Sequence, residues 1–211
     1  MKASIVTMTF NPALDTSTSI HHVVPEKKLR CDPPRHDPGG GGVNVARAVH
    51  RLGGDVLAVL TLGGPFGSLL GRLLENEDVP YAKIPIEGFT RESFTVRDDT
   101  SDQQYRFSLP GPELTEAEYE RCFEVLRDLD PKPDYVVASG SLTPGAPRGG
   151  YVRLAKLVRE WDGRFILDSS GEEFTRAVNE AGVFLLKPNM RELKHLVGEE
   201  IQSEEHQENA A

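Results

Sequence analysis

Short apolar segments with strand character alternate with amphipathic helical segments along most of the 211-residue chain, and this alternation restricts its possible folds more than any other feature. The strand-like segments are 4–10, 55–63, 134–140, 164–170 and 183–189. The helical segments are 44–52, about 67–76, one that begins at Thr115, about 148–160, and 171–181. Strands and helices in this order form a parallel sheet between layers of helices. We therefore predict an α/β fold whose ligands bind at the carboxyl ends of the strands.

Two segments, 16–35 and 91–109, interrupt the alternation. In the second, "RESFTVRDD" and "QQYRFSL" flank the turn-rich "DDTSDQ", which predicts a β-hairpin with one apolar face and one face that carries Arg91 and Arg106. We interpret residues 15–35 and 90–109 as a small β-sheet lid. A second copy of the chain would cover its apolar face, so the lid would also be a dimer clasp. Residues 1–14, 36–89 and 110–211 then form the α/β domain for substrate and nucleotide.

Charge and cysteine content narrow the class of protein. The net charge of -9 argues against non-specific binding to nucleic acid or to an anionic membrane. No apolar segment reaches the roughly 18 to 20 residues that cross a bilayer. Cys31 and Cys122 have neither metal-binding nor redox spacing. We expect a cytoplasmic protein with reduced cysteines and without a nucleic-acid or membrane partner.

Four consecutive glycines stand directly before a predicted helix, in "PGGGGVNVARA" (38–48). A dinucleotide-binding G-x-G-x-x-G would need glycine where Asn44 or Val45 stands, and G-x-x-x-x-G-K-[ST] does not occur in the chain. The segment could be a flexible surface loop. However, the free N–H groups at a helix start bind anions and polar ligands. Asn44 could cap this helix or offer its amide to a ligand.

Further polar residues lie at predicted strand ends and in the lid. Each also has an ordinary structural interpretation: Asp15 as a turn former, Asn189 and Glu192 as a helix cap, and the lid arginines as solvated strand residues. Together, four cations could form a basic patch suited to a small anionic substrate, because guanidinium groups bind phosphate bidentately. The four are Lys28, Arg30, Arg91 and Arg106.

The order of these elements resembles the PfkB family of sugar kinases with the ribokinase-like fold, and within it the minor bacterial 6-phosphofructokinases. The matching segments are "TFNPALD" (9–15), "PEKKLRC" (25–31), "PGGGGVNVARA" (38–48), "TRESF" (90–94), "QYRFSLPG" (104–111), "SGSLTPG" (139–145), "LDSSGE" (167–172) and "KPNMREL" (187–193). The 1-phosphofructokinases and tagatose-6-phosphate kinases are similar too. They tend to have a lysine within the glycine run, which this chain lacks, so we favour fructose 6-phosphate.

The resemblance implies transfer of the ATP γ-phosphoryl group to the C1 hydroxyl of fructose 6-phosphate, with Mg²⁺. It assigns three groups of residues. Those that hold the sugar hydroxyls are Asp15, Gly40, Gly41 and Asn44, with Ser139 approaching the sugar. Those that hold the 6-phosphate are Arg91 and Lys28, the latter from the partner subunit's lid, together with Arg30 and Arg106. Those that face the ATP phosphates are Lys187, Asn189 and Glu192, with Glu192 reaching Mg²⁺ through water.

One family element is not in the sequence. The second signature of the family, a G-A-G-D element, supplies the catalytic aspartate, and it does not occur in these 211 residues. We therefore expect that this polypeptide alone binds sugar phosphate weakly, if at all, and does not turn over, unless the 211 residues are part of a longer enzyme. A related activity, 1-phosphofructokinase or tagatose-6-phosphate kinase, and a non-catalytic sugar-phosphate-binding module are the alternatives.

Overall fold

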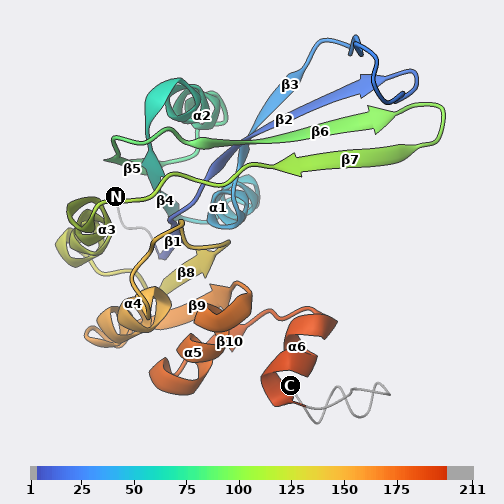
Figure 1. Ribbon diagram of the computed structural model, residues 1–211. Helices are drawn as coiled ribbons and strands as arrows, with labels where there is room; N and C mark the ends of the chain where they lie inside the picture. Colours follow the sequence, from blue (N-terminus) through green and yellow to red (C-terminus); the bar gives the residue numbers. More distant parts are fainter. Residues whose placement is uncertain (1–3, 199–211) are drawn as a thin grey trace.

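A six-stranded parallel sheet forms the centre of the molecule in the computed structural model, which describes residues 4–198 (Figure 1). Its strand order is β10-β9-β8-β1-β4-β5, and every pair of neighbours is parallel. The strands are β1 (Ile5–Thr9), β4 (Val56–Leu62), β5 (Tyr81–Pro85), β8 (Tyr135–Ser139), β9 (Arg164–Asp168) and β10 (Leu185–Leu186). The predicted parallel α/β fold is confirmed. Two details differ, because β5 was not predicted and β10 is shorter than the predicted segment 183–189.

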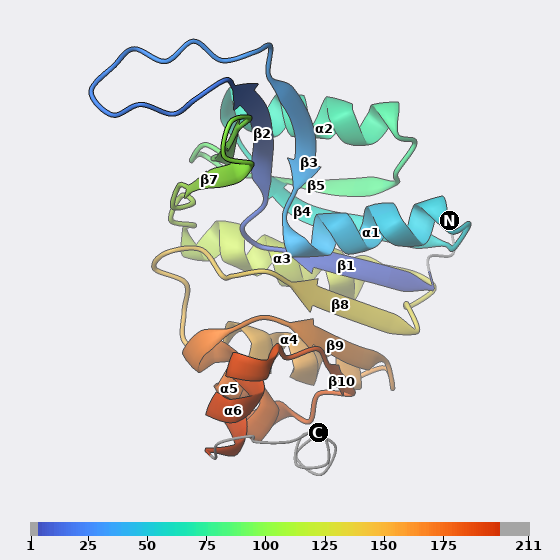
Figure 2. The ribbon, with the colours of Figure 1, turned by 90° about the vertical axis from the view of Figure 1, so that its right-hand side faces the viewer.

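Helices cover both faces of this sheet (Figure 2). In β4, Ala58 and Leu60 join a core cluster with α1 and α2, whereas the intervening Val59 joins the cluster of the opposite face. Strands buried on both faces are expected to be nearly continuously apolar, as β4 is apart from Thr61. The helices are α1 (Gly41–Arg51), α2 (Gly64–Asn76), α3 (Glu116–Asp128), α4 (Gly150–Arg159), α5 (Gly171–Ala181) and α6 (Met190–Val197).

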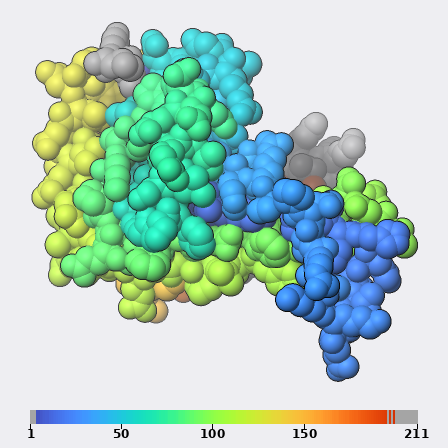
Figure 3. Space-filling view, turned by 90° about the horizontal axis from the view of Figure 1, so that it is seen from above, coloured from blue at the N-terminus to red at the C-terminus, as the bar shows by residue number. Residues whose placement is uncertain are grey.

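A second, four-stranded sheet extends from the body of the molecule (Figures 1 and 3). Its order is β3-β2-β6-β7, from β2 (Ala13–Ile20), β3 (Arg35–Gly39), β6 (Arg91–Asp98) and β7 (Gln103–Ser108). The antiparallel pair β6–β7 confirms the predicted hairpin. The strand β3, "RHDPG", was not predicted, because it has no apolar alternation of its own. It becomes a strand by pairing with β2.

The outer end of this sheet is fixed by the buried carboxylate of Asp98. It accepts hydrogen bonds from the backbone N–H groups of Val23, Thr100 and Ser101, and it contacts the His22 ring at 2.9 Å. These bonds lower the pKa of Asp98 to about 2. One end of the exposed 21–34 segment is thereby held against the sheet.

Helix α3 begins with the predicted capping box. Thr115 Oγ1 accepts from the Glu118 N–H at 3.2 Å, and Glu118 Oε2 accepts from the Thr115 N–H at 2.8 Å. We expect Thr115→Ala to lower the free energy of unfolding by about 1 kcal/mol, because it leaves an N-terminal N–H without its acceptor. Urea denaturation measures this change. Glu124→Ala, at an exposed position of the same helix, is the control and should stay within about 0.5 kcal/mol of wild type. Equal losses in the two variants would contradict the capping role.

Candidate active site

The glycine run forms the start of α1, which begins three residues earlier than the sequence predicted. Gly40 is the N-cap, with φ of 111°, and the helix starts at Gly41. Asn44 is therefore not the cap. Its backbone N–H donates to Gly40 O at 2.9 Å within the first turn, and its side chain is exposed. The capping role considered for Asn44 is therefore excluded, and its role as a ligand contact stays a prediction.

Close packing within the protein explains much of the need for glycine. An ideal Cβ on Gly41 would lie 2.2 Å from Ser139 Oγ, and one on Gly42 would lie 2.4 Å from Thr9 Oγ1. On Gly39 it would lie 2.4 Å from the Asp15 carboxylate. The start of α1 thus packs directly on the carboxyl ends of β1 and β8. This contact places the free N–H groups of the helix at the edge of the sheet where ligands bind.

Asp15 lies within β2 rather than at the end of the first strand, where the sequence had suggested it. In the small sheet it is opposite Asp37 of β3 and beside Ser93 of β6. Burial raises the pKa of its carboxyl, Arg91 and Arg106 oppose that shift, and Asp37 adds to it. A half-buried carboxylate with two nearby cations is a candidate acceptor for ligand hydroxyl groups.

Arg91 and Arg106 share the face of the sheet that carries Asp15. Strand register pairs Asp15 with Ser93, and the next residue on that face of β6, Thr95, with Arg106. Arg91 Nη1 donates to Ser108 Oγ at 2.9 Å, and burial lowers the pKa of Arg91. Arg106 is exposed. The predicted polar face of the hairpin is thus present, with one half-buried and one exposed guanidinium group.

Lys28 and Arg30 lie in the exposed segment between β2 and β3, which projects beyond the strands as the blue loop in Figure 2. Neither side chain makes a hydrogen bond or an ion pair with another residue of 4–198. The charges that act on Asp15 within this chain are those of Arg91, Arg106 and Asp37. The interpretation of Lys28 and Arg30 as phosphate ligands therefore stays a prediction.

A second polar group lies at the carboxyl ends of β8, β9 and β10. Ser139 Oγ donates to Asp168 Oδ2 at 2.9 Å, and Lys187 Nζ lies 3.1 Å from Asp168 Oδ1. These contacts connect the predicted residues Ser139 and Lys187 through Asp168, and Ser139 lies next to Gly41. Asp168 was missed as a site residue. Its signal is a carboxylate directly after the buried strand "RFIL".

Asn189 and Glu192 form the capping box of α6. Asn189 Oδ1 accepts from the N–H groups of Arg191 and Glu192, and Glu192 Oε2 accepts from the Asn189 N–H at 2.8 Å. Asn189 is thus the N-cap, in agreement with the ordinary structural interpretation of these two residues from the sequence. Both residues line a cavity of about 440 Å³ with Ser170, Gly171, Phe174, Thr175 and Arg191.

This region has limited capacity to hold a metal ion by itself. No cluster of three or more metal-binding side chains occurs within residues 4–198. Glu192 has one carboxylate oxygen outside the capping bond. That donor suits Mg²⁺, which binds one or two carboxylates and otherwise keeps water and substrate phosphates as ligands. Among the described helices, none is both long and apolar enough to cross a membrane.

Comparison with known proteins places these features in context. The sequence profile of the pfkB family carbohydrate kinases matches residues 8–211. The chain is 50% identical over 210 residues to ATP-dependent 6-phosphofructokinase isozyme 2 of Mycobacterium tuberculosis, covering 100% of this chain and 61% of that protein. For the protein of the same name in Escherichia coli, identity is 39% over 197 residues, covering 93% and 63%.

A solved structure agrees with this match over the whole chain. The crystal structure of E. coli phosphofructokinase-2 in complex with fructose-6-phosphate has a TM-score of 0.93 at 38% identity, and the match covers 100% of this chain and 69% of that one. The predicted three-layer ribokinase-like fold with a small additional sheet is thereby confirmed. The chain spans less than two thirds of the length of the curated relatives that it matches, at 61% and 63%.

Proposed function

The chain belongs to the pfkB family of carbohydrate kinases, and from this premise we propose that it provides the sugar-phosphate site of an ATP-dependent fructose 6-phosphate kinase. The observation that carries the proposal is the half-buried Asp15, with Arg91 and Arg106 on the same face, beside the glycine-rich start of α1. A carboxylate and guanidinium groups so close together suit a ligand that has both hydroxyl and phosphate groups.

In this proposal the sugar lies between the lid and the start of α1. Asp15 accepts hydrogen bonds from sugar hydroxyls, and Asn44 and Ser139 make further polar contacts. Gly40 and Gly41 let the backbone come close to the sugar. Arg91 and Arg106 bind the 6-phosphate, and Lys28 reaches the same phosphate from the partner subunit, with Arg30 near it.

The phosphates of ATP lie at the second polar group, near Lys187, Asn189 and Glu192. Lys187 neutralises phosphate charge, which is the main contribution that a protein makes to phosphoryl transfer. Mg²⁺, held by Glu192 through water, supplies further charge neutralisation when bound. The C1 hydroxyl attacks the γ-phosphorus, ADP leaves, and a base takes the hydroxyl proton. In the family that base is the aspartate of the G-A-G-D element, which does not occur within residues 1–211.

The small sheet closes over the sugar as a lid and pairs with a second lid in a homodimer. Its other face carries Phe94 opposite Phe107 and Val96 opposite Tyr105. Phe107 is 54% exposed and Tyr105 is 37% exposed, so a second copy would bury apolar surface. Closure would exclude water, which otherwise accepts the phosphoryl group. We place the kinase in the cytoplasm, where ATP is available and free thiols such as Cys31 and Cys122 stay reduced.

Binding tests the sugar site directly. In an NMR titration with fructose 6-phosphate at up to tens of millimolar, we expect saturable shifts at residues 15, 44 and 91. Fructose, which lacks the phosphate, should bind at least about 10-fold more weakly, because it cannot engage the arginines. Equal affinity for the two sugars would contradict the assigned phosphate site.

A chimera tests phosphoryl transfer. It carries residues 1–198 of this chain followed by the remaining part of the M. tuberculosis relative. We expect ATP-dependent phosphorylation of fructose 6-phosphate, with lower kcat/KM for tagatose 6-phosphate and fructose 1-phosphate. A preference for one of those two sugars would favour the corresponding alternative kinase. Binding without turnover in the chimera would favour a non-catalytic sugar-phosphate-binding module.

A further inference from the structure

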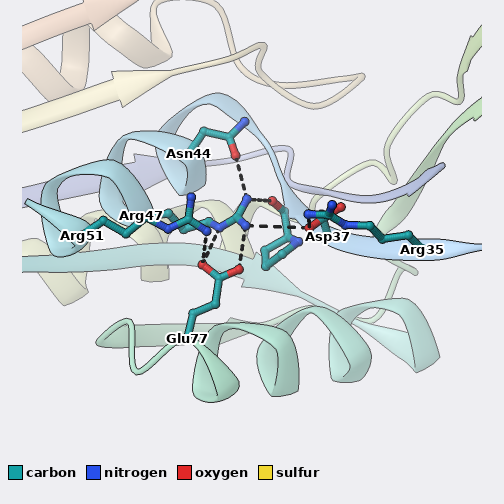
Figure 4. A network of polar contacts seen from close by, with 7 residues as sticks. Arg35, Asp37, Asn44, Arg47, Arg51 and Glu77 are labelled. Carbon is teal, nitrogen blue, oxygen red and sulfur yellow. Dashed lines mark hydrogen bonds and ion pairs between the residues drawn. The ribbon is translucent and has the colours of Figure 1, made fainter.

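Arg47 of α1 is a nearly buried arginine that connects three elements around the glycine run (Figure 4). Its Nε and Nη2 donate to the two carboxylate oxygens of Glu77, at the end of α2, over 2.8 and 2.6 Å. Its Nη1 donates to Pro38 O in β3 at 3.1 Å and to Asn44 Oδ1 at 3.4 Å. One guanidinium group thus binds both ends of the glycine run and anchors them to α2.

The anchoring pair is well defined. The side chain of Arg47 is 12% exposed and that of Glu77 is 26% exposed. The hydrogen bonds between them raise the pKa of Arg47 and lower that of Glu77. Arg51 contacts the same carboxylate at 3.1 Å, but it is 63% exposed. A bidentate, largely desolvated pair fixes geometry better than an exposed one.

The groups that Arg47 holds are adjacent to the sugar site. Pro38 directly precedes Gly39, where an ideal Cβ would lie 2.4 Å from the Asp15 carboxylate, and Asp37 is opposite Asp15 in the sheet. Asn44 lies in the first turn of α1. Because its Oδ1 accepts from Arg47, its Nδ2 is left pointing away from the network, as Figure 4 shows.

We propose that Arg47 is a positioning residue for the sugar site, and that it acts by fixing the amide of Asn44 so that Nδ2 donates to a sugar hydroxyl. This inference rests on the proposed function, which puts the sugar beside Asn44. It assigns Asn44 the role of a hydrogen-bond donor. It also gives Arg47 a task that lysine cannot perform, because an ammonium group cannot bind Glu77 bidentately and also reach Pro38 O and Asn44.

Affinity for fructose 6-phosphate, measured by NMR titration, tests the proposal in a double-mutant cycle. Asn44→Ala should weaken binding about 10-fold, through loss of one donor. Arg47→Lys should weaken it by a similar factor, because the donor is no longer oriented. The double variant should lose little more than either single variant, since both changes remove the same contact. Additive losses, about 100-fold in the double variant, would show that Arg47 does not act through Asn44.

Two further variants separate positioning from folding. Arg51→Gln removes the exposed partner of Glu77 and should change affinity less than about 2-fold. Glu77→Gln leaves Arg47 in place but weakens its anchor. It should weaken binding about 3-fold, again without additivity to Asn44→Ala. If Arg47→Lys does not fold, the Glu77→Gln cycle decides the question. Full affinity in Glu77→Gln would contradict the proposal.

Hydrogen exchange tests the restraint without any sugar. The amides of residues 39–44 should exchange at least about 10-fold faster in Arg47→Lys than in wild type, while those of β8 are unchanged. Equal exchange at 39–44 would overturn the inference even if the sugar binds. Conversely, exchange could be faster in Arg47→Lys while the wild-type protein binds no fructose 6-phosphate. That result would overturn the proposed function and the role of Asn44, and Arg47 would then be a structural residue only.

Discussion

Gly41→Ala is expected to displace the start of α1 from the sheet and to abolish the sugar-phosphate site. The new Cβ would lie 2.2 Å from Ser139 Oγ, 2.8 Å from Ser139 C and 2.9 Å from Gly140 N. Two of these three atoms belong to the backbone at the end of the buried strand β8 and cannot move away alone. We expect the free energy of unfolding to fall by about 3 kcal/mol, at the upper end for an overpacked core position, and fructose 6-phosphate binding to be lost.

Urea denaturation and the sugar titration measure these two effects. Gly71→Ala is the control, because Gly71 is likewise a glycine within a helix and is buried. Its Cβ would come within 3 Å only of Tyr81 Oη, the end of a side chain, at 2.9 Å. It should stay within about 1 kcal/mol of wild type, since the gain in helix propensity offsets part of the contact.

A second substitution tests which atoms of β8 clash with the new Cβ of Gly41→Ala. Adding Ser139→Ala to Gly41→Ala removes the hydroxyl but leaves both backbone contacts. We expect the pair to recover less than half of the lost stability. Complete recovery would show that only the Ser139 hydroxyl requires glycine at this position. The close approach would then be incidental to the docking of α1 on β8.

The sequence predicted those parts of the fold whose cause is local. The continuous apolar segments became the parallel strands because both faces of the sheet are covered. The T-x-x-E pattern became the capping box of α3 because its bonds span only three residues. The strand β3 could not be predicted, since "RHDPG" has no strand pattern and depends on β2 as its partner.

The site shows the same division between local and long-range causes. Asp15, Arg91 and Arg106 were selected from the sequence, but their common face follows from a register between β2, β6 and β7. Asp168 and Arg47 were missed as site residues. Their roles come from Lys187 and Ser139 in one case and from Glu77 in the other, 19 to 30 residues away along the chain. Such contacts have no fixed spacing in a sequence.

Asp15→Asn is expected to weaken fructose 6-phosphate binding about 100-fold while making the folded protein more stable at neutral pH. The first effect follows from loss of an ionised acceptor, which forms stronger hydrogen bonds than a neutral amide. The second follows from the direction of its pKa shift. Burial raises the pKa of Asp15 above its ordinary value of 3.8, so the ionised carboxylate disfavours the folded state.

The sign of this effect sets its pH dependence. A carboxyl group with a raised pKa in the folded state contributes stability below its ordinary pKa, and that contribution is lost as the pH rises through the folded-state value. The difference in Tm between Asp15→Asn and wild type should therefore be small near pH 3.5 and grow as the pH rises above that range. Thermal unfolding at pH 3.5, 5 and 7 measures it.

Asp99→Asn, in the turn directly after β6, is the control. Asp99 is paired with Arg97 at 2.9 Å near the outer end of the lid, so its replacement should change sugar affinity less than about 2-fold and bring no gain in Tm. A loss of stability in Asp15→Asn at pH 7 would mean that the carboxylate holds the sheet together. A gain in stability together with a loss of binding would identify Asp15 as a residue that serves ligand binding. Its charge would then destabilise the folded protein and be required only for the ligand.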